Sequence, residues 1–270
     1  MLRARLEGLT VTNTFWDADV YTRIGKPMRR WAKQVIEDLG LRGDETVLDA
    51  GCGSGAVTLD LLERLPRGQI YAVDASPEMI DALQREIQQR RITNVHLMRA
   101  SLTDFALPEP VDVVFSNAVF HWIPDDEGLF GSLFRATKDG GRLRAQCGGY
   151  GNNVHVLEAV AAVREQPRFE AHLRGFSDTK KYRTPDEAKR SLVAAGWRDV
   201  RANLWAQPVP FEDLDEAALY VRTILLRDHV ARLPDDDGDA YARAVVDETV
   251  RRWGAPYVAD YVRLDLWARK

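Results

Sequence analysis

Residues 47–55 read VLDAGCGSG, an apolar run that ends in Asp49 and is followed by glycines at 51, 53 and 55. The apolar run predicts a buried strand, and the apolar spacing after Gly55 predicts a helix. A sharp turn has to join them. Glycines in such a turn let a ligand approach backbone N–H groups that a Cβ atom would shield. The stretch therefore predicts a strand, a ligand-binding turn and a helix.

A second acid, Asp74, follows the next predicted strand, about 20 residues beyond the glycines. A carboxylate there can accept two hydrogen bonds from ribose hydroxyls. The turn and Asp74 together indicate a nucleoside-containing ligand far more specifically than either feature alone. Each has a plainer alternative, which is an ordinary tight turn for the glycines and a helix N-terminal acid for Asp74.

The spacing of Gly51, Gly53 and Ala56 also fits the looser dinucleotide fingerprint, so a nicotinamide or flavin dinucleotide stays open as the ligand. Asp49 argues against a dinucleotide, because its negative charge would lie close to the negative charges of the pyrophosphate. S-adenosylmethionine (SAM) instead carries an ammonium and a sulfonium, which suit a carboxylate. The turn is therefore predicted to bind SAM.

Strand and helix patterns alternate through residues 40–150, which predicts a parallel sheet covered on both faces. The expected strands are Thr46–Ala50, Gln69–Val73, Val95–Met98, Val111–Ser116 and Arg142–Cys147. The expected helices are Ala56–Leu65, Ser76 to about Arg91 and Glu127–Thr137.

The pattern beyond residue 150 is mainly helical. Helices are expected over Asn153–Arg174, from Thr184 to Gly196 and over Phe211–Trp253, the last with a break at 233–238. Strands are expected over Trp197–Ala206 and Val258–Ala268. We predict one domain of residues 1–270, with a helical cap at 15–39, a ligand-binding core at 40–150 and helical insertions at 151–183 and 211–254. Insertions at the carboxyl edge of such a sheet would form a lid over the ligand crevice.

The composition limits the kinds of partner that the protein is expected to bind. The formal net charge of −4 argues against a broad nucleic-acid surface, which needs an excess of Lys and Arg. No apolar run approaches the roughly 20 residues of a membrane span, so no membrane partner is expected. The histidines lack metal-ligand spacing, so no metal is expected. With two cysteines in the whole chain and no apolar leader, a cytoplasmic protein is expected.

The chain resembles the class I SAM-dependent methyltransferase superfamily in three segments, VLDAGCGSG, YAVDASPEMI and DVVFSNAVFHWIPD. The resemblance extends to the later segment YRTPDEAKRSLVAAGW. The SNAVFHW segment, Gln146 and the C-terminal helical insertion are similar to the trans-aconitate methyltransferase group, which methylates a small carboxylic acid on oxygen. The resemblance implies a Rossmann-like α/β fold. Its sheet would have seven mostly parallel strands, one of them antiparallel, with helices on both faces and helical lid insertions.

The resemblance also implies cofactor roles. Gly51, Gly53 and Gly55 would line the methionine part of SAM, with Asp49 near its amino group. Asp74 would hold the ribose, and Ala75 would lie beside the adenine. Ser101, followed by Leu102, stands where such enzymes usually have an Asp, and Asp104 is the alternative. Ser116 and Asn117 would face the methionine and the methyl group, and Tyr21 and Lys26 would fold over the cofactor; a solvated surface lysine is the alternative for Lys26.

Fewer sequence features indicate which residues bind the methyl acceptor. His121 is expected to orient an acceptor oxygen or take a proton, with Asn117 beside it, and packing against Trp122 is the alternative for His121. Gln146 and Tyr150 lie where polar groups could reach the crevice, and Arg222 could clamp a carboxylate.

The predicted function is SAM-dependent O-methylation of a small carboxylic acid, which releases S-adenosylhomocysteine (SAH), by a monomer or homodimer. A non-catalytic SAM-binding regulator or partner subunit and an NAD-dependent oxidoreductase are the alternatives.

Overall fold

The computed structural model of the chain describes residues 26–270, with side chains at 29 and from 31 onward. Tyr21 and the rest of residues 15–25, the first part of the predicted cap at 15–39, lie outside the described residues. Lys26 is the first residue of α3 (Lys26–Asp38), and its side chain lies outside them too.

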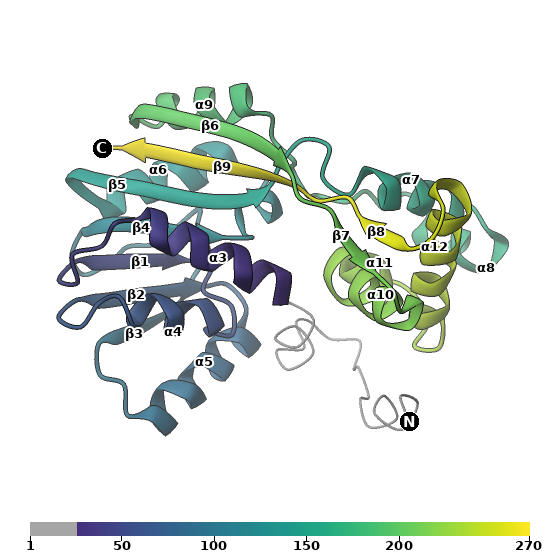
Figure 1. Cartoon of the computed structure of the whole chain (residues 1–270), viewed down its shortest axis with the longest axis horizontal. Helices are drawn as coiled ribbons and strands as arrows, with labels where there is room; N and C mark the ends of the chain where they lie inside the picture. The colour runs from purple at the N-terminus through teal and green to yellow at the C-terminus, as the bar shows by residue number, and fades with distance from the viewer. Residues whose placement is uncertain (1–25) are drawn as a thin grey trace.

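A seven-stranded sheet forms the centre of the molecule, in the order β3-β2-β1-β4-β5-β9-β6 (Figure 1). Its first five strands run parallel, and β9 is antiparallel to both β5 and β6. This confirms the expected fold class. The strands are β1 (Thr46–Ala50), β2 (Gln69–Asp74), β3 (Val95–Arg99), β4 (Val111–Asn117), β5 (Thr137–Gly148), β6 (Arg198–Ala206) and β9 (Val262–Arg269).

Helices cover both faces of the sheet because its strands are apolar on both sides. Val47 packs into a core with α3, α4 (Ala56–Leu62) and α5 (Pro77–Arg90), whereas its neighbour Leu48 packs into a core with α6 (Asp126–Ala136) and α9 (Pro185–Ala194). Successive strand residues point to opposite faces. The continuous apolar runs in the sequence thus correspond to strands buried on both sides.

A helical unit lies beyond the carboxyl ends of the parallel strands (Figure 1). It has its own apolar core, which also takes in Trp31 and Tyr261. Its elements are α7 (Val154–Val163), α8 (Pro167–Leu173), α10 (Leu214–Tyr220), a π-helical turn (Val221–Leu225), α11 (Arg227–Val230), α12 (Asp237–Trp253) and the pair β7 (Val209–Phe211) and β8 (Tyr257–Ala259).

Two differences from the predicted elements concern the helical unit. The single strand expected over Val258–Ala268 is two strands, because the Tyr261 N–H turns back to the Ala259 carbonyl at 2.9 Å and separates β8 from β9. The helix expected from Phe211 begins at Leu214 instead. Asp213 caps it by accepting from the Asp215 N–H at 2.8 Å, and Phe211 pairs with Tyr257 in the small sheet.

Candidate active site

The glycine turn joins β1 to α4, and all three glycines have left-handed backbone with φ between 54° and 88°. A Cβ on Gly51 would lie 2.3 Å from Val119, and one on Gly55 would lie 2.2 Å from Leu83. Gly53 is different, since its Cβ would meet only the Met79 sulfur at 4.0 Å. Packing therefore requires two of the glycines, and Gly53 presents open backbone.

Asp74 ties this turn to the end of β2. One carboxylate oxygen accepts from the Gly53 N–H and the other from the Ser76 N–H, both at 2.9 Å. Burial raises the pKa of this carboxyl above its ordinary value, although those backbone donors oppose the shift. Each oxygen keeps a lone pair for a further donor.

Asp49 is buried at the end of β1 and accepts a hydrogen bond from the Thr58 hydroxyl at 2.7 Å. Burial raises the pKa of Asp49 to about 7, and the charge of Asp74 adds to the shift. The two acids thus make this end of the site favourable for a cation.

A cavity of about 440 Å³, here the large cavity, opens beside the glycine turn. Its size is that of a small-molecule site. The predicted cofactor residues that line it are Asp49, Gly51, Gly53, Gly55, Asp74, Ala75, Ser101, Leu102 and Asn117. The lining residues not predicted include Arg29, Cys52, Met79, Thr179, Arg227 and Asp228.

Ser116 is not among the described residues that line the large cavity. Its hydroxyl donates to the Ala50 carbonyl at 2.6 Å inside the sheet, so it does not face a ligand as expected. Ser101 lines the cavity with its hydroxyl 2.8 Å from that of Thr103. The alternative, Asp104, is also absent from the described lining.

A second cavity of about 30 Å³, here the small cavity, adjoins the large one and shares Ala118 and Trp122 with it. Ala118 has φ of 62°, which is strained for a residue with a Cβ. Its N–H donates to the Gln146 carbonyl at 2.7 Å, which holds this conformation. The other lining residues are His121, Gly148, Asn152, Asn153, Lys180, Tyr182, Ile224, Leu225, Tyr261 and Arg263.

His121 is buried, and its Nδ1 accepts a hydrogen bond from the Gly148 N–H at 3.2 Å. The other ring nitrogen, Nε2, therefore carries the proton in the neutral ring. Burial lowers the pKa of His121 well below its ordinary value, and the charges of Arg263 and Lys180 lower it further. His121 is a neutral hydrogen-bond donor that stacks on Tyr182, with ring centroids 5.7 Å apart.

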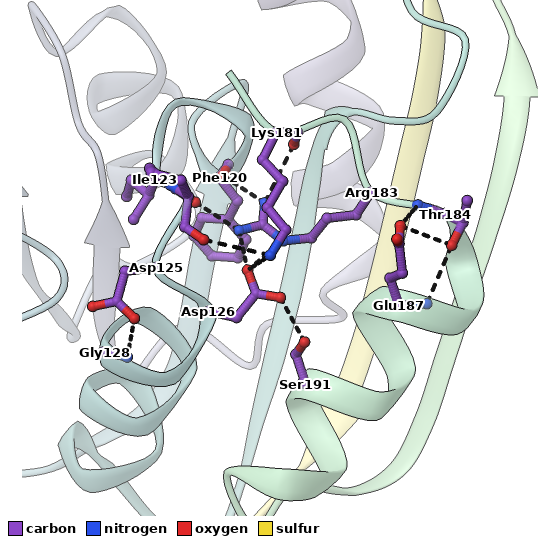
Figure 2. A network of polar contacts seen from close by, with 11 residues as sticks. Phe120, Ile123, Asp125, Asp126, Gly128, Lys181, Arg183, Thr184, Glu187 and Ser191 are labelled. Atoms are coloured by element: carbon purple, nitrogen blue, oxygen red, sulfur yellow. Dashed lines mark hydrogen bonds and ion pairs between the residues drawn. The ribbon is translucent and has the colours of Figure 1, made fainter. Parts of the chain in front are cut away.

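Arg183 fixes the segment from Phe120 to Ile123 (Figure 2). Its guanidinium pairs with Asp126 and donates to the carbonyls of Phe120 at 2.8 Å and Ile123 at 2.6 Å. The Lys181 N–H also donates to the His121 carbonyl at 2.8 Å. These bonds hold Lys180 and Tyr182 against the short 3₁₀ helix that carries His121 and Trp122.

Three predicted acceptor residues lie outside both cavities. Gln146 is buried between Asp265, to which it donates at 2.8 Å, and Arg263, from which it accepts at 3.2 Å. Tyr150 is 66% exposed, because its backbone pairs with Arg183 while its ring points to solvent. Arg222 pairs with Asp239 at 2.8 Å on α12. The arginine of that region that reaches the large cavity is Arg227.

Within residues 26–270, no three His, Cys, Asp or Glu side chains gather as a metal site. No helix in this described part is long and apolar enough to cross a membrane.

Comparisons with known proteins agree with this geometry. A family described as "Methyltransferase domain" matches residues 47–141. Trans-aconitate 2-methyltransferase of Azoarcus sp. (strain BH72) is 32% identical over 241 residues, which are 85% of this chain and 87% of that relative. The enzyme of the same name from Acidovorax ebreus (strain TPSY) is 30% identical, over 48% of this chain and 49% of its own length.

Solved structures share the fold at lower identity. A putative methyltransferase from Bacillus halodurans C-125 has a TM-score of 0.61 and 16% identity, over 88% of this chain and 98% of its own. Geranyl diphosphate C-methyltransferase from Streptomyces coelicolor A3(2), crystallised with SAH, has a TM-score of 0.55 and 19% identity, over 93% of this chain and 84% of its own.

The strand order, the glycine turn after β1 and the acid at the end of β2 are those of a class I SAM-dependent methyltransferase. This chain belongs to that superfamily and, within it, to the group of trans-aconitate methyltransferase homologues. It is therefore an enzyme of the SAM-dependent methyltransferase class, and the dinucleotide-dependent oxidoreductase is set aside.

Proposed function

We propose that this enzyme methylates a small carboxylic acid on a carboxylate oxygen, at the junction of the two cavities. One observation carries the proposal. Asp49 and Asp74 lie beside the glycine turn in the large cavity, whose described lining holds three aspartates and two arginines in all. The charged side chains lining the small cavity, among the described residues, are Lys180 and Arg263. A cationic methyl donor and an anionic acceptor fit these two cavities in that order.

The residues of the large cavity fit SAM. Open backbone at Gly53 leaves room for the ligand, and the remaining lone pairs of Asp74 suit ribose hydroxyls. Asp49 would lie near the ammonium, and Ala75, Ser101 and Leu102 would surround the adenine. When bound, SAM supplies a methyl group whose bond to sulfur breaks as its bond to the carboxylate oxygen forms; the sulfur keeps the electron pair and no proton moves.

A carboxylate nucleophile needs no base, which agrees with a neutral His121. The Nε2–H of His121 would donate to an acceptor oxygen and orient it, and Trp122 would form the shared wall. Ile224 and Leu225 keep this side apolar and exclude water. We assign the role of lid to the helical insertions 151–183 and 211–254, which supply these residues together with Lys180 and Tyr182.

The name of the Azoarcus relative supports an acidic acceptor, and trans-aconitic acid is therefore the first compound to test. Cys52 and Cys147 are both free and buried, in keeping with the cytoplasmic location proposed here.

The test uses methyl-labelled SAM with four classes of small molecule: carboxylic acids, phenols, alcohols and amines. We expect the label in a methyl ester, identified by NMR, and no transfer to the other three classes. Labelling of a nitrogen or a phenol instead would contradict carboxylate methylation. Calorimetric binding of SAH without turnover on any class would favour the non-catalytic regulator.

A further inference from the structure

The wall of the large cavity comes from two parts of the molecule. Most of the lining belongs to the glycine turn and the ends of the parallel strands. Three lining residues, Thr179, Arg227 and Asp228, come instead from the helical insertions 151–183 and 211–254, the proposed lid. A cofactor in this cavity is therefore held partly by the lid, and the contacts that join the lid to the sheet affect how firmly it is held.

Trp122 makes such a contact with two cations of the lid. The ammonium of Lys180 lies 4.7 Å from the centroid of the Trp122 ring, and the guanidinium of Arg227 lies 5.2 Å from it. Both distances are within the roughly 6 Å over which a cation is attracted to an aromatic ring, and tryptophan attracts most strongly. These three residues, here the Trp122 clamp, join both insertions to the 3₁₀ helix beside the sheet.

The aromatic half of the clamp is fixed by its backbone. The Trp122 N–H donates to the Val119 carbonyl at 2.8 Å. The carbonyls of Phe120 and Ile123, on either side of Trp122, both accept from the Arg183 guanidinium (Figure 2). The ring therefore offers a fixed surface, and any movement at the clamp is a movement of the lid.

The π-helical turn Val221–Leu225 brings the cationic half into place. The Leu226 N–H donates to the Val221 carbonyl at 2.8 Å, five residues back, and the Leu225 carbonyl accepts from the Lys180 ammonium at 3.1 Å. Arg227 follows directly. A π turn adds one residue to the helix, which turns everything after it by about 100°. A regular α-helix at this position would direct Arg227 away from the Trp122 ring.

The two cations differ in how easily they can leave the ring. The Lys180 side chain is 4% exposed and has Asp178 as its ion partner, so its separation from the ring would disturb a buried charge. The Arg227 side chain is 26% exposed, and its Nε–H donates at 3.0 Å to Asp228, which moves with it as its neighbour in the chain. Arg227 is therefore the half of the clamp that can open.

We propose that Arg227 is a positioning residue that holds the lid closed over the cofactor by its contact with Trp122, and that this contact slows the release of SAH. Release takes place from the open lid, and each opening separates Arg227 from the ring, so the free energy of the contact adds to the cost of opening. The proposal rests on SAM as the cofactor and on the helical insertions as its lid, and not on the nature of the acceptor. Its failure would leave carboxylate methylation intact.

The test measures the release of labelled SAH from the full chain after an excess of unlabelled SAH is added. We expect release to be about fivefold faster from Arg227→Gln than from the wild type. Arg168→Gln is the matched control, because Arg168 also pairs with an aspartate, Asp237, and lies 5.6 Å from an aromatic centroid, that of Phe169, but is outside the described lining of both cavities. Its release rate should equal that of the wild type. An unchanged rate in Arg227→Gln overturns the proposal.

A direct contact between Arg227 and the cofactor would also slow release, so a second comparison removes the ring. In a Trp122→Leu background, Arg227→Gln should change the release rate by less than about twofold, because the two residues act through one contact. The milder Trp122→Phe background keeps a weaker ring, should give an intermediate effect and covers a loss of folding in the leucine variant. Arg227→Lys keeps a cation near the ring and should restore release to within about twofold of the wild type. A full fivefold effect in both Trp122 backgrounds overturns the proposal and assigns Arg227 to the cofactor itself.

Discussion

The two cavities are built in different ways. The turn of the large cavity is made by one continuous segment, residues 49–56, with Asp74 as its principal support. The lining of the small cavity comes from separate stretches, 118–122, 148–153, 180–182, 224–225 and 261–263. The first depends on backbone conformation, and the second depends on side chains that tertiary structure brings together. Changes to the large cavity should therefore affect stability and cofactor affinity, and changes to the small cavity should affect only the acceptor.

The largest expected effect tests the backbone origin of the large cavity. Gly55→Ala places a methyl group 2.2 Å from Leu83 at φ of 88°, whereas Gly175→Ala places one in open space at φ of 74°. Both positions have positive φ, and only the first has the clash. We expect Gly55→Ala to lose about 3–5 kcal/mol of unfolding free energy and Gly175→Ala about 1–2 kcal/mol, measured by urea denaturation.

SAH binding should fail with Gly55→Ala and persist with Gly175→Ala. Equal losses of stability in the two variants would show that φ alone, and not packing against Leu83, requires the glycine.

The next effect tests Asp74 as the ribose acceptor. Asp74→Ala removes the proposed bonds to the ligand and leaves the Gly53 N–H without its acceptor. We expect SAH affinity to fall about ten- to hundredfold, because hydrogen bonds to a charged group contribute about 1.5–3 kcal/mol. Asp104→Ala is the control, since Asp104 lies after the next strand and outside the described lining. Calorimetry that gives the same affinity for Asp74→Ala and the wild type would contradict the assignment.

The same contrast explains what the sequence could predict. Glycines at 51, 53 and 55 and Asp74 lie close together in the chain, so their spacing alone indicates a strand, a turn and a neighbouring strand end. The strands that alternate with helices were likewise visible, because each is a local apolar run. The break between β8 and β9 was missed, since it depends on Tyr261 packing into the helical unit rather than on a turn-forming sequence.

Local sequence patterns could not predict the small cavity. Arg263 reaches it because β9 runs antiparallel to β5 and places Arg263 opposite Gly148, a register that no spacing in the sequence gives. Arg222 was predicted to clamp a carboxylate, yet it lies in the π-helical turn and pairs with Asp239. Residues that meet only through strand register or an irregular helix leave no motif behind.

A smaller effect concerns pH and Asp49. Burial raises the pKa of Asp49 to about 7, so the folded chain holds a proton there that the unfolded chain releases at lower pH. The stability from this proton is complete below the unfolded pKa and is lost as pH rises through about 7. A bound ammonium favours the ionised carboxylate, so SAH affinity should rise about tenfold between about pH 6 and 8. Asp49→Asn should flatten this dependence in calorimetry; an unchanged slope would place the proton elsewhere.

The smallest effect separates the roles of His121 in the small cavity. A general base would contribute about a hundredfold or more to the rate, whereas an orienting N–H donor contributes about 1 kcal/mol. Gln can place an N–H near the position of Nε2 but cannot act as a base. We therefore expect His121→Gln to lower kcat/KM by about fivefold or less, with SAH affinity unchanged and His172→Gln, an exposed histidine on α8, as the control. A hundredfold loss in His121→Gln would show that His121 acts as a general base, and it would indicate an acceptor less acidic than a carboxylic acid.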